Sequence, residues 1–149
     1  MKRTKIICAL VLLLAGCATT EQQIRSSAQH YLDATGRYDV ADACLYCTPE
    51  TADGLRLLDT TVMRIVDSNY IRSNMPAEVK ITAINITSDS TAEVEYHKHT
   101  PIADLDGTID MVLRDGDWLA SVKISIPYFL RNDHQEFHYD SVGELRVVE

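Results

Sequence analysis

The stretch Tyr31-Leu32-Asp33-Ala34-Thr35-Gly36-Arg37-Tyr38-Asp39 decides how this chain folds, because one helix ends in it and the next begins. Gly36 stands where a left-handed C-cap would end the first helix, and Asp39 can accept the free N–H groups of the second. Thr48-Pro49-Glu50 repeats the start signal with an N-cap, a proline at the first helical position and an acid in the first turn. We therefore predict three successive helices between Ile24 and Asn74.

Apolar residues recur at helical spacing throughout this segment. The first predicted helix buries the face that carries Ile24, Ala28, Tyr31 and Leu32. The second is short, from Val40 to about Cys47. The third is the longest and runs to Asn74, and we expect it to be the helix that lies across a sheet.

From Val79 onward the apolar period changes from helical spacing to two, which is typical of strands. The apolar phase slips between Ile81 and Ile84, which predicts a bulge. Turns are predicted at Ser88-Asp89-Ser90, Asp104-Leu105-Asp106-Gly107 and Asp115-Gly116-Asp117. The following strands have one apolar face each, formed by Ala92, Val94 and Tyr96, by Ile109, Met111 and Leu113, and by Trp118, Ala120, Val122, Ile124 and Ile126. Helices followed by about four antiparallel strands predict an α+β fold.

The first seventeen residues have the pattern of an export signal. Three basic residues precede an apolar run, Ile6 to Ala15, that is too short to span a bilayer. The run ends in Leu14-Ala15-Gly16-Cys17, which resembles the lipobox of bacterial lipoproteins. The resemblance implies removal of residues 1–16, acylation of Cys17, a short polar tether over residues 17–23 and, with Ala18 after the cysteine, an outer-membrane location. The alternative is an ordinary secretory signal with an incidental Cys17.

Charge excludes several kinds of partner. The formal net charge is −8, and loss of the basic residues Lys2, Arg3 and Lys5 with the signal leaves −11. A domain this acidic has no electrostatic footprint for nucleic acid or an anionic lipid surface. We therefore expect the lipid alone to hold the protein to the membrane.

The remaining chain, 24–126, is predicted to be one domain that resembles the NTF2-like superfamily and, within it, small bacterial lipoproteins of the DUF4878 type, described as resembling lumazine-binding domains. Tyr31, the junction Thr35-Gly36-Arg37-Tyr38-Asp39, Thr48-Pro49-Glu50 and the hairpin Leu113-Arg114-Asp115-Gly116-Asp117-Trp118 carry the likeness. It implies a cystatin-like cone, with N-terminal helices packed on a curved antiparallel sheet. Residues 127–149 depart from the family pattern as a C-terminal extension, either a further edge strand over Gly143–Glu149 or a tail.

Cys44 and Cys47 form a C-x-x-C pair late in a short helix. A redox cysteine needs a helix N-terminus to lower its thiol pKa, and a zinc site needs two more ligands at defined spacing. These requirements leave either a local disulfide or two packed thiols. No metal site and no cofactor are predicted.

His97 and His99 lie two apart on one predicted strand, a spacing that lets two histidines share a metal ion, and Glu93 and Glu95 share their face. The interpretation that we favour is a solvated outer face of an antiparallel sheet.

The NTF2-like resemblance implies a cavity between the helices and the concave sheet that hosts a ligand or, in isomerase-like members, a general base beside an oxyanion hole. Asp110 is predicted to face outward. The inward candidates are aromatic residues, which are either core or pocket-lining: Tyr31, Tyr38, Tyr70, Tyr96 and Trp118.

The sequence thus favours a non-enzymatic, lipid-anchored envelope lipoprotein that binds a small apolar or aromatic ligand or an envelope protein. Binding would use the cavity or the sheet face, and a homodimer through that face is a further possibility. One rival is an isomerase or hydrolase that uses the cavity. The other is an assembly component that docks through the tail from Phe129.

Overall fold

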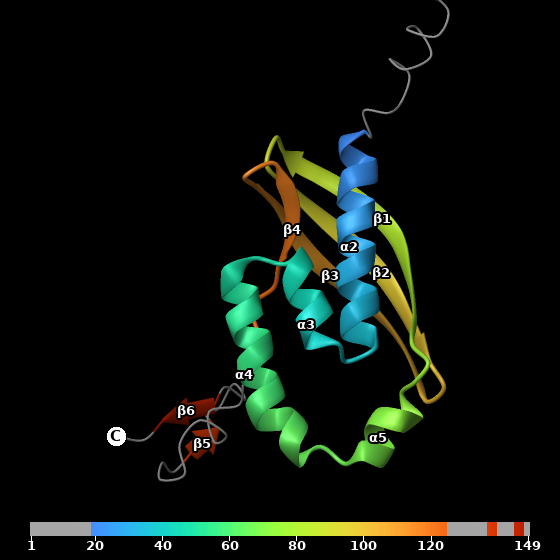
Figure 1. Cartoon of the computed structure of the whole chain (residues 1–149), viewed down its shortest axis with the longest axis vertical. Helices are drawn as coiled ribbons and strands as arrows, with labels where there is room; N and C mark the ends of the chain where they lie inside the picture. The colour runs from blue at the N-terminus through green and yellow to red at the C-terminus, as the bar shows by residue number, and fades with distance from the viewer. Residues whose placement is uncertain (1–18, 125–136, 140–144, 148–149) are drawn as a thin grey trace, which may run out of the picture.

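The computed structural model describes residues 19–124, 137–139 and 145–147 (Figure 1). The elements are α2 (Thr20–Gly36), α3 (Val40–Ala43), the 3-10 turn η2 (Cys44–Tyr46), α4 (Pro49–Ile65), α5 (Ser68–Ser73), β1 (Glu78–Ser88), β2 (Thr91–Thr100), β3 (Ala103–Arg114) and β4 (Asp117–Ser121). The helices pack against an antiparallel sheet of order β1-β2-β3-β4. The predicted α+β class is confirmed, and the arrangement is consistent with an NTF2-like cone.

Helix α2 begins earlier than the sequence analysis placed it. Thr19 and Gln22 form a capping box, in which the Thr19 N–H donates to Gln22 Oε1 at 2.9 Å and the Gln22 N–H donates to Thr19 Oγ1 at 3.3 Å. The predicted tether over residues 17–23 is therefore wrong from Thr20 onward, because those residues are helical.

The C-terminus of α2 does not use Gly36 as its left-handed residue. Gly36 is still helical, and Tyr38 takes the positive φ of 58°. The Tyr38 N–H donates to the Thr35 carbonyl at 3.1 Å and the Asp39 N–H to the Ala34 carbonyl at 2.9 Å, which is the Schellman pattern. The prediction for Gly36 is wrong by two residues. The N-cap prediction for Asp39 is confirmed, because its Oδ1 accepts from the Asp42 N–H at 3.0 Å.

The third predicted helix is two helices in the structure. Val66 is extended, and Asp67 caps α5 by accepting from the Asn69 N–H at 2.8 Å. The Asp67 side chain competes with the backbone for hydrogen bonds at this point. The helix that the apolar spacing predicted as continuous therefore ends here, and a new one begins. The start of α4 agrees with its prediction, since Thr48 Oγ1 accepts from the Thr51 N–H at 3.3 Å with Pro49 in the first turn.

Helix α2, and not the long third helix, lies across the sheet (Figure 1). The Ser27 hydroxyl donates to the Trp118 carbonyl in β4, and Gln29 Nε2 donates to the Val79 carbonyl in β1 at 2.9 Å. These bonds hold α2 to both edge strands. Its apolar face meets the inner side of the sheet in a core that includes Ile24, Ala28, Tyr31, Leu32, Ile81, Val94, Ile109, Met111, Trp118 and Ala120.

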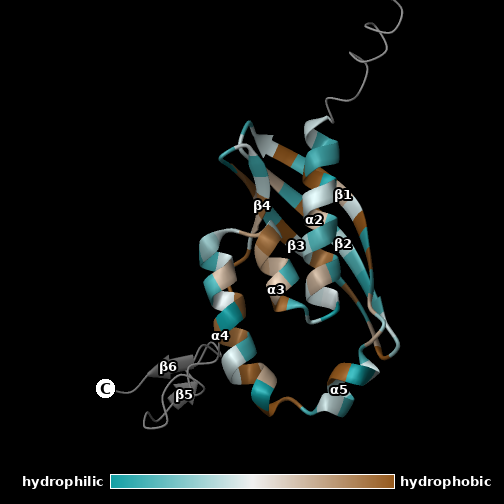
Figure 2. Cartoon of the chain, in the orientation of Figure 1, coloured by the Kyte–Doolittle hydropathy of each residue, from teal (hydrophilic) through white to brown (hydrophobic). Residues whose placement is uncertain are grey.

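Helix α4 is attached to the sheet at its beginning. The Thr48 N–H donates to the Ala120 carbonyl at 2.9 Å, and Thr51 Oγ1 exchanges bonds with the Val122 carbonyl and N–H at 3.0 and 2.9 Å. Further along, Ile65 is 68% exposed. The alternation of hydrophilic and hydrophobic residues along α4 is visible in Figure 2.

The sheet contains the predicted bulge and the predicted hairpin turn. Ile81 pairs with Tyr96 but Ala83 pairs with Glu95, so Thr82 is the extra residue. Asp115 and Gly116 have φ values of 53° and 90°, as a type I′ turn requires.

The turn predicted at Asp104-Leu105-Asp106-Gly107 is wrong. These residues belong to β3, which starts at Ala103, and they pair with Tyr96 to His99 of β2. The chain reverses instead after Thr100, whose hydroxyl donates to the Ala103 carbonyl at 3.1 Å and accepts from the Ala103 N–H at 3.0 Å.

Near the C-terminus, β5 (Phe137–Tyr139) pairs with β6 (Leu145–Val147) in a separate two-stranded sheet. The strand considered within Gly143–Glu149 therefore exists as β6, but it does not pair with the main sheet. Residues 1–18, including Cys17, and the rest of the extension 127–149 lie outside the described residues. Among the described helices, none combines the length and the apolar character needed to cross a bilayer.

Candidate functional site

The five aromatic residues predicted to line a pocket do not share one. Tyr31 and Trp118 are buried in the core at 4% and 5% exposure. Tyr96 is half-buried, and its ring lies over Gly107 on β3, where a Cβ would overlap the ring. Burial raises the pKa of Tyr31 well above its usual range, with Cys47 and Tyr96 adding to the effect. Tyr31 is a core residue, whereas Trp118 and Tyr96 also line two separate surface pockets.

Tyr38 and Tyr70 lie apart from that core. Tyr38 is half-buried and Tyr70 is 57% exposed. Burial raises the pKa of Tyr38, and the charge of the nearby Tyr70 phenol raises it further. Tyr70 is thus a surface residue, and the prediction that it faces inward is wrong.

A small apolar pocket opens where the end of α2, helix α3 and helix α4 meet. Its volume is about 150 Å³, and nearly all of its surface is apolar. The pocket is lined by Thr35, Tyr38, Val40, Ala43, Leu55, Leu58 and Met63. Of the predicted aromatic residues, Tyr38 alone contributes to it. The sequence analysis missed the aliphatic lining, which could have been found from the apolar spacing of the third predicted helix.

Cys44 and Cys47 are free thiols in the structure. Cys47 is 5% exposed, and burial, together with the neighbouring Cys44 thiol, raises its pKa to about 12. Cys44 Sγ lies 3.9 Å from the Ala52 carbonyl oxygen. Of the two alternatives left by the sequence, the structure has the packed thiols. A thiol with so high a pKa is a poor nucleophile near neutral pH.

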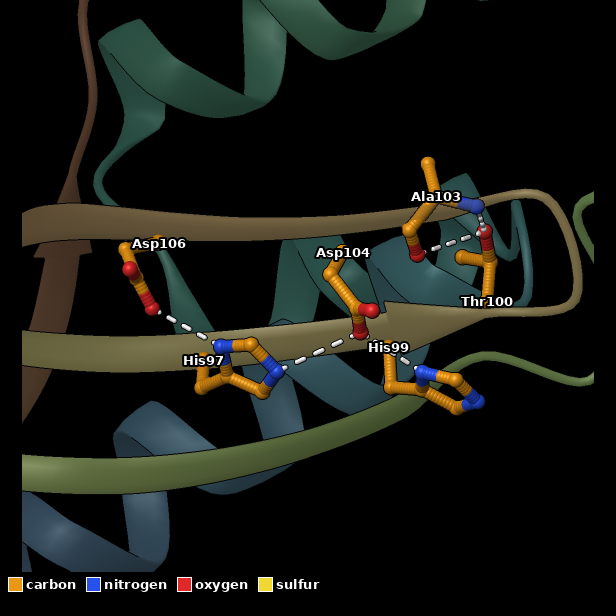
Figure 3. A network of polar contacts seen from close by, with 6 residues as sticks. All are labelled: His97, His99, Thr100, Ala103, Asp104 and Asp106. Carbon is orange, nitrogen blue, oxygen red and sulfur yellow. Dashed lines mark hydrogen bonds and ion pairs between the residues drawn. The ribbon is translucent and has the colours of Figure 1, made fainter.

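The outer face of the sheet carries a histidine–aspartate network that joins β2 to β3 (Figure 3). His97 Nδ1 lies 2.8 Å from Asp106 Oδ1, and His97 Nε2 lies 3.4 Å from Asp104 Oδ1. His99 Nδ1 lies 2.6 Å from the same Asp104 oxygen. Asp104 therefore stands between the two imidazole rings, and both histidines point to the same side of the sheet.

Charge couples these four side chains. The hydrogen bond from His97 to Asp106, aided by the negative charges of Asp106 and Asp104, raises the pKa of His97 above its usual range. The hydrogen bond from His99, aided by the positive charge of both histidines, lowers the pKa of Asp104. Among the residues that the structure describes, no group of three or more His, Cys, Asp or Glu side chains is placed so that it could hold a metal ion.

Strand register explains the network and why the sequence analysis missed half of it. His97 stands directly opposite Asp106, and His99 opposite Asp104. The predicted turn over Asp104-Leu105-Asp106-Gly107 separates the two aspartates from the histidines. The alternation Asp104, Asp106, Thr108, Asp110 has a period of two and could have extended the strand. Asp110 is exposed, as predicted.

The comparisons with known proteins identify no relative of this chain. A scan against protein-family models finds no match, and no curated protein matches the sequence. The proposals that follow rest on the residues and their geometry.

Proposed function

We propose that this protein is a lipid-anchored lipoprotein of the bacterial envelope, held by Cys17 in the outer membrane, whose NTF2-like domain binds a small apolar or aromatic ligand without catalysing a reaction. The observation that carries the binding function is the apolar pocket between α2, α3 and α4. An apolar pocket of this size has room for an apolar molecule of about the size of benzene.

The position of the pocket agrees with an anchored binder. Helix α2 starts three residues after Cys17, so its first turn lies near the proposed lipid. The pocket is lined by Thr35 and Tyr38 at the other end of this helix, which is roughly 25 Å long for its 17 residues. The pocket therefore lies at the end of α2 far from the proposed lipid.

The inner face of the sheet carries few groups that an isomerase or hydrolase, the alternative function, would use as a general base. The buried polar residues of the described chain are Thr48, Thr51 and Thr100. Thr48 and Thr51 bond to each other and Thr51 to Val122, while Thr100 closes the β2–β3 turn. Among the ionisable groups in or beside this core, Tyr31, Tyr96 and Cys47 have pKa values that burial raises, so they stay protonated near neutral pH. None of these three is suited to act as a general base.

Benzene is a suitable first probe for the pocket. It should raise the melting temperature of the protein by a few degrees, because a ligand that binds only the folded state stabilises it. The Val40→Phe substitution fills the pocket from its lining and should abolish this shift. Val62→Phe, at a half-buried α4 position outside the lining, is the matched control and should keep it. An equal shift in Val40→Phe, or none in the wild-type protein, would refute pocket binding.

Lipid anchoring has its own test. Detergent-phase partitioning should be lost in Cys17→Ser, because the thioether to the diacylglyceryl group cannot form. Cys8→Ser, within the same signal, should partition like the wild-type protein. Persistence of Cys17→Ser in the detergent phase would contradict the anchor.

A further inference from the structure

We propose that Cys44 and Cys47 are a site of reversible disulfide formation, which closes by exchange with a small disulfide such as glutathione disulfide. The structure has the pair as two free thiols. This site is separate from the apolar pocket and does not depend on the proposed ligand-binding function. Three observations support it: the backbone geometry of the pair, the contact between the two thiols and the access to Cys44.

The backbone brings the two cysteines to a separation that a disulfide can span. Cys44 is the first residue of the 3-10 turn η2, and Cys47 directly follows its last residue. Side chains three residues apart in a 3-10 turn eclipse each other, and three steps of about 2.0 Å place their Cα atoms about 6 Å apart. Disulfides join residues whose Cα atoms are about 4.4–6.8 Å apart. A 3-10 turn therefore meets this distance requirement.

Cys47 is fixed to the sheet, whereas Cys44 belongs to the helical turn. Cys47 is extended, with φ and ψ of −133° and 166°, while Cys44 is helical, with −63° and −19°. Cys47 pairs with Ala120 of β4 in an isolated parallel bridge, and the Thr48 N–H donates to the Ala120 carbonyl at 2.9 Å. These contacts hold Cys47 in place, so it is the Cys44 side chain that must turn to close the bond.

The two thiols already contact each other. Burial, the charge of Cys44 and a hydrogen bond with the Cys44 side chain together raise the pKa of Cys47 to about 12, against the opposing charge of Arg56. A hydrogen bond that raises the pKa of a thiol stabilises its protonated form, so the Cys47 S–H donates and Cys44 Sγ accepts. Cys44 Sγ in turn donates to the Ala52 carbonyl oxygen at 3.9 Å. The two sulfur atoms thus lie next to each other and have to approach to about 2.05 Å to form a disulfide.

A surface hollow between α3 and α4 gives access to Cys44. Its volume is about 440 Å³. The hollow is lined by Val40, Ala41, Cys44, Leu45, Arg56 and Asp59. Cys44 is half-buried, whereas Cys47 is 5% exposed and does not belong to the lining. An incoming disulfide can therefore reach Cys44 but not Cys47.

The bond forms in two exchange steps. The Cys44 sulfur loses its proton and attacks one sulfur of glutathione disulfide, which forms a mixed disulfide and releases one glutathione. The Cys47 sulfur then loses its proton and attacks Cys44 Sγ, which forms the Cys44–Cys47 bond and releases the second glutathione. The two cysteines lose two electrons and two protons, and glutathione disulfide gains them to become two thiols. Because the thiolate is the nucleophile and the pKa of Cys47 is high, the second step should be the slow one.

The test follows the tryptic peptide 38–56 by mass spectrometry, because this peptide contains both cysteines and neither Cys8 nor Cys17. The full chain is purified in detergent, reduced and incubated in its folded state with glutathione disulfide, and the remaining free thiols are then blocked with N-ethylmaleimide. The peptide should first gain one glutathione and then lose it, ending two hydrogen atoms lighter than the dithiol form. Dithiothreitol should restore both thiols.

Two matched variants test the order of the steps. Cys47→Ser should stop at the mixed disulfide, because it lacks the second thiol. Cys44→Ser should form a mixed disulfide at least about tenfold more slowly than Cys47→Ser, because Cys47 is buried. The proposal is overturned if the folded wild-type protein keeps two thiols or stops at the mixed disulfide. It is equally overturned if Cys44→Ser and Cys47→Ser react at the same rate.

Discussion

The two faces of β2 differ completely in what they contact. On the inner face Ala92 and Val94 are buried at 3% and 0% exposure against α2 and the neighbouring strands. On the outer face His97 and His99 reach across to aspartates of β3 and remain in contact with water. Because successive side chains of a strand point to opposite faces, one ten-residue strand serves the core and a polar network at once. Substitutions on the two faces should therefore have separable effects.

The largest effect is expected in the centre of the inner face. Met111 is fully buried, so Met111→Ala should lower the free energy of unfolding by about 2–5 kcal/mol through lost burial and a cavity. Asp110→Ala, its exposed neighbour on the opposite face, should change it by less than about 0.5 kcal/mol. Urea denaturation of both variants measures the contrast. Similar losses in the two variants would show that the faces are not distinct.

A smaller effect is expected where α4 joins the edge of the sheet. Thr51→Val removes the hydroxyl that bonds both the N–H and the carbonyl of Val122, and should cost about 1–3 kcal/mol. Thr60→Val makes the same change in the same helix at an exposed residue that bonds only within the helix. It should cost less than about 0.5 kcal/mol. Equal stabilities would mean that the Thr51 bonds do not hold α4 to the segment that follows β4.

The smallest effect is expected at an exposed ion pair and depends on pH. Glu50 accepts from its own backbone N–H at the start of α4 and from Arg114 Nη1 at 3.0 Å, and these bonds lower its pKa. Because the pKa of Glu50 is lowered in the folded protein, its ionised carboxylate stabilises the fold at pH values above its ordinary pKa of 4.5. This stabilisation is lost as the pH falls through the folded-state pKa. Glu50→Gln should therefore differ from the wild-type protein at pH 7 and converge with it in acid. Arg114→Met should show a weaker form of the same behaviour.

The sequence predicted best those features that depend on neighbouring residues alone. The phase slip after Ile81 gave the bulge, Asp115-Gly116 gave the hairpin turn, and Thr48 with Pro49 gave the start of α4. In each case the local chemistry and the tertiary structure demand the same conformation.

The errors arose where tertiary contacts choose between local alternatives. Asp104-Leu105-Asp106-Gly107 has the composition of a turn, but pairing with β2 makes it a strand. The apolar spacing of the third predicted helix gave no sign that α2 would be the helix bonded to both β1 and β4. The histidine–aspartate network could not be predicted in full from the sequence, because it requires the aspartates to stand opposite the histidines.

The separation of the two faces is tested most directly by Val94→Ala and His97→Gln, each measured for its free energy of unfolding in urea. Val94 is fully buried, so its truncation should cost about 2 kcal/mol. His97 lies on the exposed outer face, so His97→Gln should change the free energy of unfolding by less than about 0.5 kcal/mol. A loss in His97→Gln as large as that in Val94→Ala would contradict this account of the sheet.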